Sequence, residues 1–253
     1  MSHPILEGAE PWSHVGEGPA GALVIHGFTG NPSSMRGLAA AFAAAGFHVE
    51  MPRLPGHGTH LDDMLTTTWA DWYGEAEAAY QRLAARTDKI VVAGLSMGGA
   101  LTLRLGADHP EIAGLVCINA ATTPLGDAAM VEMLQGFVDA GTEVMPGIGS
   151  DIAEPGVTES AYEGAPVRPL ISLIDALEPL SHAYATMHVP LLILASPQDH
   201  VVPPEQQDYL AAHYAGPVER VTLERSYHVA TQDYDKQLIF DASVEFAKKV
   251  TAG

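Results

Sequence analysis

The stretch VVAGLSMGGALTLR, residues 91–104, places a single serine between an apolar run and a helical pattern. Its centre, Gly-Leu-Ser-Met-Gly, matches the G-x-S-x-G pattern of a nucleophile elbow. A sharp turn from strand to helix strains the backbone at the serine, and side chains two positions away would collide. Gly94 and Gly98 remove those side chains. We therefore expect Ser96 to project its hydroxyl from the carboxyl edge of a sheet, at a helix N-terminus that favours negative charge.

Apolar runs of strand length recur along the chain, with helical patterns between several of them. These runs occupy residues 22–28, 48–54, 89–95, 114–120 and 190–196. Their apolar character is continuous rather than alternating, which is typical of strands buried on both faces of a mostly parallel sheet. Alternation of strands and helices predicts a doubly wound α/β fold with helices on both faces.

Two of the helical patterns have recognisable ends. SSMRGLAAAFAAAGF, residues 33–47, stops at Gly46, which suits a helix C-terminus. TTWADWYGEAEAAYQRLAART, residues 67–87, begins with Thr68 and Asp71 at the spacing of a capping box. Both segments are therefore expected to be helices.

The alternation stops between about residues 122 and 186. This segment is rich in proline and contains short helical patches such as DAAMVEMLQGFVDA and PLISLIDALEPL. A long insertion of short helices in an α/β domain usually covers a site. We therefore expect a core formed by residues 1–121 and 187–253, and a small helical cap formed by residues 122–186.

A serine hydroxyl is a weak nucleophile that needs a base, and the base needs a carboxylate to hold it. After an elbow of this kind, the acid and then the histidine follow on loops beyond strand ends. Asp199 comes shortly after the run at 190–196, and His228 follows the last strand pattern at 217–226. These positions predict Ser96 as nucleophile, Asp199 as acid and His228 as base.

Negative charge that develops on a carbonyl oxygen needs backbone donors nearby. The N–H of Met97, directly after the serine, is the first expected donor, and the N–H of Phe28 in the bend HGFTG is the second. Each such donor typically lowers the barrier by about 3 to 4 kcal/mol. His26 in this bend is expected to brace the loop by hydrogen bonding rather than to act in catalysis.

Residues 56–60, GHGTH, followed by Asp62 and Asp63, raise the question of a metal site. The segment is rich in glycine and lacks helical ligand spacing, so a structural loop on the oxyanion side is the favoured interpretation. We expect no metal ion and no cofactor.

Composition disfavours several other classes of protein. The formal charge is −19 and no Lys/Arg cluster occurs, so nucleic acid and anionic membranes are poor partners. The single cysteine, Cys117, lies in an apolar run and is expected to be buried and inert. The N-terminus lacks a signal-peptide pattern, and no apolar segment reaches the roughly 18 to 20 residues of a membrane span. We therefore expect a cytoplasmic protein, with a monomer and a homodimer both open.

Several motifs together resemble one group of enzymes. HGFTGN, PRLPGHGTH, GLSMGGALT, QDHVVPP and SYHVAT resemble the capped α/β-hydrolases of the bacterial monoacylglycerol lipase and thermostable carboxylesterase group. The similarity extends through IGSDIAEPGVTESAYEGAP in the expected cap. It implies an α/β-hydrolase fold with a cap insertion. It also implies that Glu159 accepts hydrogen bonds from a glycerol hydroxyl and that Ile148 lines the path of the alcohol or acyl chain.

Taken together, these features predict a serine hydrolase that cleaves carboxylic esters through an acyl-enzyme. The resemblance favours monoacylglycerols, cleaved to glycerol and free fatty acid. Apolar cap residues such as Met130, Met133, Phe137 and Met145 suit an acyl chain, although they could be ordinary core. The expected partner is a small lipid ester, with at most transient contact with lipid aggregates or a membrane surface.

Other functions stay open on the same fold. A general short- or medium-chain carboxylesterase and a carbon–carbon bond hydrolase use the same triad. A protein that binds a ligand without catalysis is a further possibility. A dehalogenase or epoxide hydrolase is disfavoured, because those enzymes need a carboxylate nucleophile where this chain has Ser96.

Overall fold

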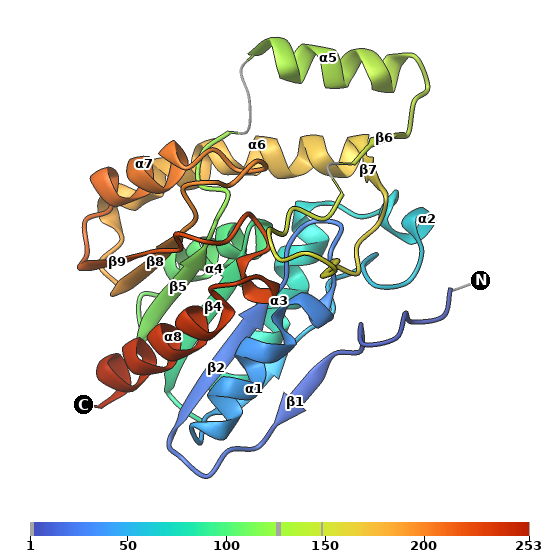
Figure 1. Cartoon of the computed structure of the whole chain (residues 1–253). Helices are drawn as coiled ribbons and strands as arrows, with labels where there is room; N and C mark the ends of the chain where they lie inside the picture. The colour runs from blue at the N-terminus through green and yellow to red at the C-terminus, as the bar shows by residue number, and fades with distance from the viewer. Residues whose placement is uncertain (1–2, 125–127, 148, 253) are drawn as a thin grey trace.

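The computed structural model describes residues 3–124, 128–147 and 149–252 and is built around a seven-stranded sheet (Figure 1). The strand order is β1-β3-β2-β4-β5-β8-β9. Only β1 pairs antiparallel with its neighbour, and the other pairs in this sheet are parallel. The predicted mostly parallel sheet is therefore confirmed. The strands are β1 (Trp12–His14), β2 (Ala20–Ile25), β3 (His48–Met51), β4 (Lys89–Leu95), β5 (Gly114–Ile118), β8 (Leu191–Ala195) and β9 (Val218–Thr222).

Helices cover both faces of this sheet, as the sequence pattern predicts. On one face α1 and α8 lie side by side, and their apolar residues pack against the strands in one cluster (Figure 1). On the other face α3, α4 and α6 enclose a second cluster. The α-helices are α1 (Arg36–Ala44), α2 (Leu61–Met64), α3 (Trp69–Ala84), α4 (Met97–Asp108), α5 (Ala128–Asp139), α6 (Val167–Ala183), α7 (Glu205–His213) and α8 (Lys236–Thr251). The described residues also form the short 3₁₀ helices η1 (Pro32–Met35), η2 (Tyr184–Thr186) and η3 (Ala230–Gln232).

Strands β4, β5 and β8 form the middle of the sheet and are almost wholly buried. Leu95 pairs with Ile118, and Ile118 pairs with Leu194, so these three strands end at one edge. Parallel strands bring the loops beyond their carboxyl ends together, which is where ligands bind in open α/β sheets. Cys117 is fully buried in β5, as predicted, and burial raises the pKa of its thiol, which keeps it protonated.

The predicted start of α3 is present. The backbone N–H of Thr68 donates to Oδ2 of Asp71 at 2.8 Å, and the reciprocal bond completes the capping box. The apolar pattern of the sequence did not indicate β1 or a small hairpin of β6 (Val144–Pro146) with β7 (Gly164–Pro166). Each of these strands has three residues, which is too short for a period of two to stand out.

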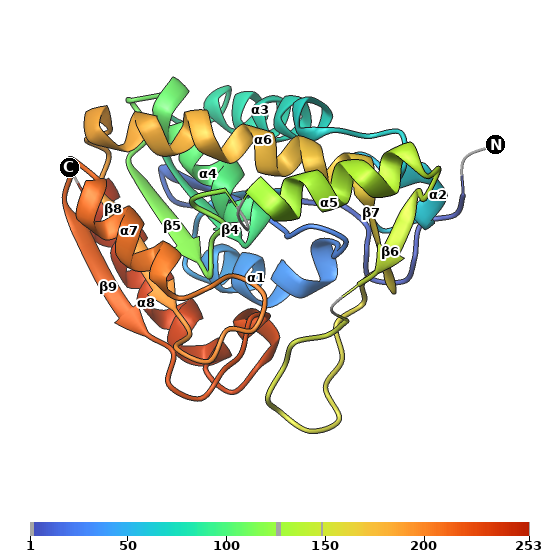
Figure 2. The same cartoon turned by 90° about the horizontal axis from the view of Figure 1, so that it is seen from above.

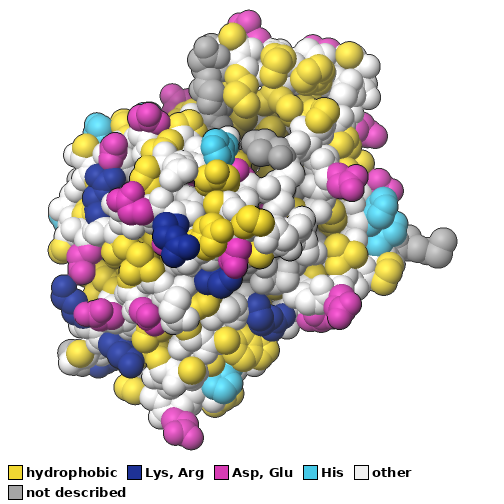
Figure 3. All heavy atoms as spheres, in the orientation of Figure 1, with side chains coloured by type: hydrophobic (Ala, Val, Ile, Leu, Met, Phe, Trp, Pro, Cys, Tyr) yellow, Lys and Arg dark blue, Asp and Glu magenta, His cyan; other side chains and the backbone are white. Residues whose placement is uncertain are grey.

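The segment between β5 and β8 carries α5, the β6–β7 hairpin and α6 (Figure 2). Leu134 of α5 packs against Val167 and Ile174 of α6 in an apolar cluster separate from the two clusters on the sheet. Met130, Phe137 and Met145, which the sequence suggested for an acyl chain, pack against this cluster. Hydrophobic side chains also gather on the outside over α5 (Figure 3), where Met133 is 48% exposed.

Within the described residues, no helix combines the length and the apolar character that crossing a bilayer requires.

Candidate active site

Ser96 lies in the sharp turn between β4 and α4. Its φ of 57° and ψ of −119° are values that side-chain-bearing residues rarely adopt. A Cβ on Gly94 would lie 2.1 Å from the carbonyl oxygen of Gly98, and one on Gly98 would lie 2.3 Å from that of Ile25. Only glycine fits both positions. The strand–turn–helix geometry predicted from residues 94–98 is therefore present.

Asp199 and His228 are joined by a short hydrogen bond at the same sheet edge. Nδ1 of His228 lies 2.8 Å from Oδ2 of Asp199, and both side chains are buried. Oδ1 of Asp199 accepts the N–H groups of Val201 and Val202 at 2.8 and 2.9 Å. An ionised carboxylate here favours the tautomer with the proton on Nδ1, which leaves Nε2 of His228 as a free proton acceptor.

The loop that carries His228 is attached next to the elbow. The N–H of Ser96 donates to the carbonyl of Ile118 at 3.0 Å. Asn119, the next residue, donates through its side-chain amide to the carbonyls of Tyr227 at 3.2 Å and His228 at 2.8 Å. The serine and the histidine are thus connected through the end of β5. Ser96 is partly exposed.

Sequence reasoning missed Asn119. It is nearly fully buried, and its φ of 42° lies in the left-handed region, where asparagine is the most tolerant residue after glycine. Its side-chain oxygen also accepts the N–H of Ser196 at 2.8 Å. An asparagine directly after a buried strand was the available signal.

The bend after β2 lies against the elbow. A Cβ on Gly27 would lie 3.3 Å from Cβ of Ser96. Within the described part of the chain, the N–H groups of Phe28 and Met97 form no hydrogen bond. Both groups are therefore free to donate to a ligand beside Ser96.

His26 braces this bend, as expected. Its Nε2 accepts the N–H of Leu54 at 3.1 Å, and its Nδ1 donates to the carbonyl of Gly27 at 2.9 Å. The ring of His57 meets that of His26 edge-on at 5.0 Å. Burial lowers the pKa of His26 well below 6.5 and that of His57 to about 4, so both rings are neutral at neutral pH.

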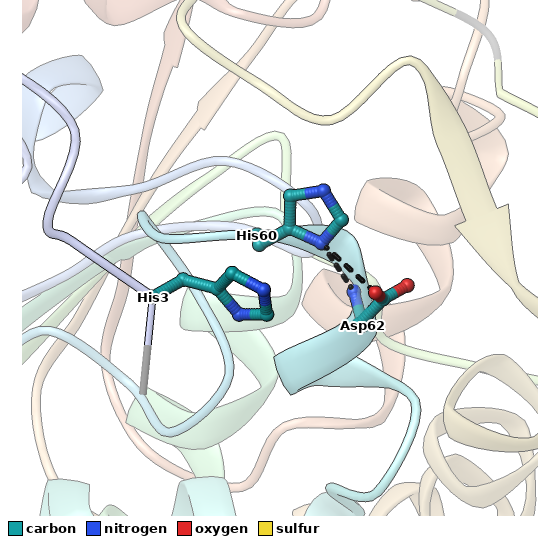
Figure 4. Close-up of side chains that lie close together, drawn as sticks. All are labelled: His3, His60 and Asp62. Atoms are coloured by element: carbon teal, nitrogen blue, oxygen red, sulfur yellow. Dashed lines mark hydrogen bonds and ion pairs between the residues drawn. The ribbon is translucent and has the colours of Figure 1, made fainter. Parts of the chain in front are cut away.

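The loop that contains His60 contacts the N-terminal segment of the chain. Among the residues that the structure describes, His3, His60 and Asp62 form the one group of three possible metal ligands with atoms within 4.8 Å (Figure 4). The two imidazole rings stack at 4.4 Å and 25°, so their in-plane lone pairs run side by side rather than converge. Nδ1 of His60 accepts the N–H of Asp62 and caps α2, while Nδ1 of His3 contacts Asp63 at 2.9 Å. The group attaches the N-terminal segment to α2, and we assign it no metal role.

Glu159 reaches the same edge from the segment between β6 and β7. A Cβ on Gly30 would lie 2.7 Å from its Oε1, so the carboxyl group lies directly against this glycine in the bend after β2. Burial raises the pKa of Glu159 to about 7, although the neighbouring His228 and a hydrogen bond from Ser34 lower it. Ile148, the other residue implied by the resemblance, lies outside the described residues.

Residues next to Glu159 are bonded to the bend. The N–H of Tyr162 donates to the carbonyl of Thr29 at 3.1 Å, and its hydroxyl donates to that of Gly56 at 2.8 Å. The side-chain amide of Asn31 donates to the carbonyl of Ser160. These bonds attach the segment to the loops that follow β2 and β3.

The chain resembles known lipases and esterases over nearly its whole length. A thermostable monoacylglycerol lipase from Bacillus sp. (strain H-257) is 44% identical over 250 residues, which cover 98% of this chain and 97% of the relative. A carboxylesterase from Bacillus subtilis (strain 168) is 25% identical, with 92% and 94% covered. A solved structure described with the metagenome-derived lipolytic enzymes LipS and LipT superposes with a TM-score of 0.92 at 42% identity, covering 97% of this chain and 100% of that one.

A solved monoacylglycerol lipase from Paleococcus ferrophilus, 18% identical with a TM-score of 0.76, shares the fold; it covers 95% of this chain and 99% of its own. The model of the alpha/beta hydrolase family matches residues 22–242. This match spans most of the sequence and agrees with the parallel sheet, the turn at Ser96 and the 44% identical relative. The chain therefore belongs to the alpha/beta hydrolase family.

Proposed function

We propose that this protein hydrolyses carboxylic esters, with monoacylglycerols as preferred substrates, and that Ser96, His228 and Asp199 carry the reaction. The observation that supports this most is the 2.8 Å bond between His228 and Asp199. The loop of His228 is bonded to Asn119 at the end of β5, and Ser96, held in a strained turn, is bonded to the residue before Asn119. The 44% identity to a monoacylglycerol lipase supports the choice of substrate.

In the first half of the reaction, Oγ of Ser96 attacks the ester carbonyl carbon while Nε2 of His228 takes the hydroxyl proton. The carbonyl oxygen becomes an oxyanion, to which the N–H groups of Phe28 and Met97 donate. His228 then gives its proton to the alcohol oxygen as the carbon–oxygen bond breaks. The alcohol leaves, and the acyl group stays on Ser96.

Water completes the cycle. His228 takes a proton from a water molecule, whose oxygen attacks the acyl carbon. The second oxyanion collapses, the proton returns to Oγ of Ser96, and the free acid leaves. Asp199 keeps the imidazole in one orientation and stabilises its positive charge in both halves. The steps use side chains, backbone donors and water.

Glycerol recognition is assigned to Glu159. Its carboxyl group lies against Gly30. It is also close enough to His228 for the histidine to lower the pKa of Glu159. Above its pKa of about 7 the carboxyl group is ionised and accepts hydrogen bonds from hydroxyl groups, which a methyl ester does not offer. Such a contact would select an alcohol that carries free hydroxyls.

Residues 122–186 are assigned as the cap that admits the substrate. The apolar cluster between α5 and α6 and the half-exposed Met133 suit contact with an acyl chain or a lipid aggregate. A single acyl chain on glycerol is easier to enclose than three chains, so triacylglycerols are expected to be poor substrates.

The direct test is Ser96→Ala with turnover of a monoacylglycerol and labelling by a fluorophosphonate as readouts. Loss of a nucleophile of this type commonly reduces turnover by about a millionfold. The folded variant is expected to lose both turnover and labelling. Turnover near that of the wild type would exclude Ser96 as the nucleophile, and a wild-type protein that neither labels nor turns over would favour a ligand-binding protein.

A further inference from the structure

Asp151 lies in the segment between β6 and β7, where it meets the two loops that carry Asp199 and His228. Its Oδ2 accepts the N–H of His228 at 3.0 Å and the N–H of His200 at 3.2 Å. Its Oδ1 lies 2.8 Å from Nδ1 of His200. The side chain is only 10% exposed, so water competes little for these bonds. The carboxylate of Asp151 thus bridges His200, which follows Asp199, and His228.

The backbone around Asp151 is bonded to the same loop. The N–H of Val229 donates to the carbonyl of Asp151 at 3.0 Å. Figure 2 shows this yellow segment reaching the orange and red loops that follow β8 and β9. Residues 151 and 228–229 therefore form two hydrogen bonds at one contact.

Asp233 attaches the residues that follow Asp151 to the loop of His228. Its carboxylate, which is fully buried, accepts the N–H groups of Ala153 at 2.7 Å, Glu154 at 3.0 Å and Tyr227 at 2.9 Å. The segment that carries Asp151 is therefore itself fixed relative to the loop of His228. A fixed carboxylate can define the position of a backbone group, whereas a mobile one cannot.

The peptide groups on both sides of His228 are held in this way. Asp151 accepts from its N–H, and Asn119 donates to its carbonyl at 2.8 Å. Two fixed peptide planes leave the imidazole little freedom beyond its own side-chain torsions. Misplacement of a reacting group by about 1 Å can reduce turnover by about a hundredfold.

We propose that Asp151 is a positioning residue for His228, which it holds in register with the loop of Asp199. The inference rests on the proposed function, because it takes His228 as the base. Among the described residues, the Asp151 side chain is bonded to the backbone of His228 and not to its imidazole. Its effect is exerted through the backbone N–H of His228 and through His200.

Three variants separate positioning from simple support of the fold. Asp151→Ala removes both acceptors, and we expect kcat to fall by about ten- to a hundredfold while KM changes by less than about twofold. Asp151→Asn keeps an oxygen for the two N–H groups, and its amide can donate to the other tautomer of His200, so most of kcat should return. Glu154→Gln, on the same segment, breaks only the ion pair with Lys236 at 3.0 Å and should leave kcat unchanged.

A second readout does not depend on turnover. Hydrogen exchange of the amides at 227–229 should accelerate in folded Asp151→Ala and stay slow in Asp151→Asn and Glu154→Gln. Wild-type kcat in Asp151→Ala, unchanged exchange in that variant, or a loss expressed only in KM would overturn the proposal. A wild-type protein without esterase turnover would overturn the proposed function instead, and the exchange measurement would still report whether Asp151 anchors this loop.

Discussion

The carboxylate of Asp199 holds the imidazole of His228 at 2.8 Å through Oδ2, while its Oδ1 is held by the N–H groups of Val201 and Val202. Both oxygens are therefore engaged. A carboxylate fixed by its own backbone cannot turn away from the histidine, and the bond to Nδ1 leaves Nε2 of His228 as the nitrogen available to accept a proton. This arrangement makes the role of Asp199 directly testable.

Asp199→Asn is expected to lower kcat by about ten thousandfold with the fold intact. The new amide group donates to Nδ1 and favours the tautomer with the proton on Nε2, which cannot accept the proton of Ser96. Steady-state kinetics on a monoacylglycerol measures the loss. Asp208→Asn, which only breaks an exposed ion pair with Arg220, is the matched control. Equal kcat values for the two variants would contradict the role of Asp199.

Gly94→Ala is expected to destabilise the protein by about 3 kcal/mol or more, because its Cβ would lie 2.1 Å from the backbone oxygen of Gly98. Gly74→Ala is the matched control, since a Cβ at Gly74 in α3 meets no atom within 4 Å. That change should stabilise the protein by about 0.5 to 1 kcal/mol. Urea unfolding measures both changes. Similar unfolding free energies for the two variants would contradict the tight turn.

Glu159→Ala is expected to reduce the preference for a monoacylglycerol over the methyl ester of the same fatty acid. At pH 8, above its pKa of about 7, Glu159 is charged. A hydrogen bond to a charged group is worth about 1.5 to 3 kcal/mol, which corresponds to roughly ten- to a hundredfold in the ratio of kcat/KM values at that pH. The ratio of the two kcat/KM values measures the effect, with Glu163→Ala as a control on the same segment. An unchanged ratio would remove Glu159 from glycerol recognition.

Glu159 should also make stability depend on pH. Its pKa is about 7 in the folded protein against an ordinary value of 4.5, because burial favours the protonated form. Its contribution to stability is therefore fully present below pH 4.5 and is lost as pH rises through about 7. The Glu159→Gln side chain stays neutral, so the free energy of unfolding of this variant should rise relative to that of the wild type by at most about 3 kcal/mol over that range. Unfolding free energies at pH 4.5, 6 and 8 give the comparison, and a constant gap between the two proteins would refute it.

His57 acts in the opposite direction. Burial lowers its pKa from 6.5 to about 4, so the unfolded chain binds a proton between these values while the folded protein does not. Its contribution to stability is present above pH 6.5 and is lost as pH falls through about 4, by up to about 3 kcal/mol. His57→Gln should flatten this acid slope. Denaturant titrations at pH 4, 5 and 7 test the expectation, and an equally steep slope in the variant would count against it.

Local sequence determined the elbow and the strands that surround it. Residues 94–98 join the end of a buried strand to the start of a helix. Any side chain at Gly94 or Gly98 would collide with the backbone, so few other residue types allow this turn. Continuous apolar runs likewise identify buried parallel strands, because helices cover both faces of such a sheet and neither face of the strand meets water. Asp199 and His228 were predicted from chain order, since loops after parallel strands meet at one edge.

Tertiary structure alone decided how that edge is held together. Asp151 lies 77 residues from His228, and Asn119 lies 109 residues from it, so no local pattern marks either contact. Glu159 and Gly30 meet in the same way, from distant parts of the chain. Hydrogen bonds of this kind depend on where the backbone has been brought by the packing of the sheet and its helices. The sequence by itself therefore determined the sharp turn at Ser96 and the fold around it, and the tertiary structure decided which distant side chains hold the loop of His228.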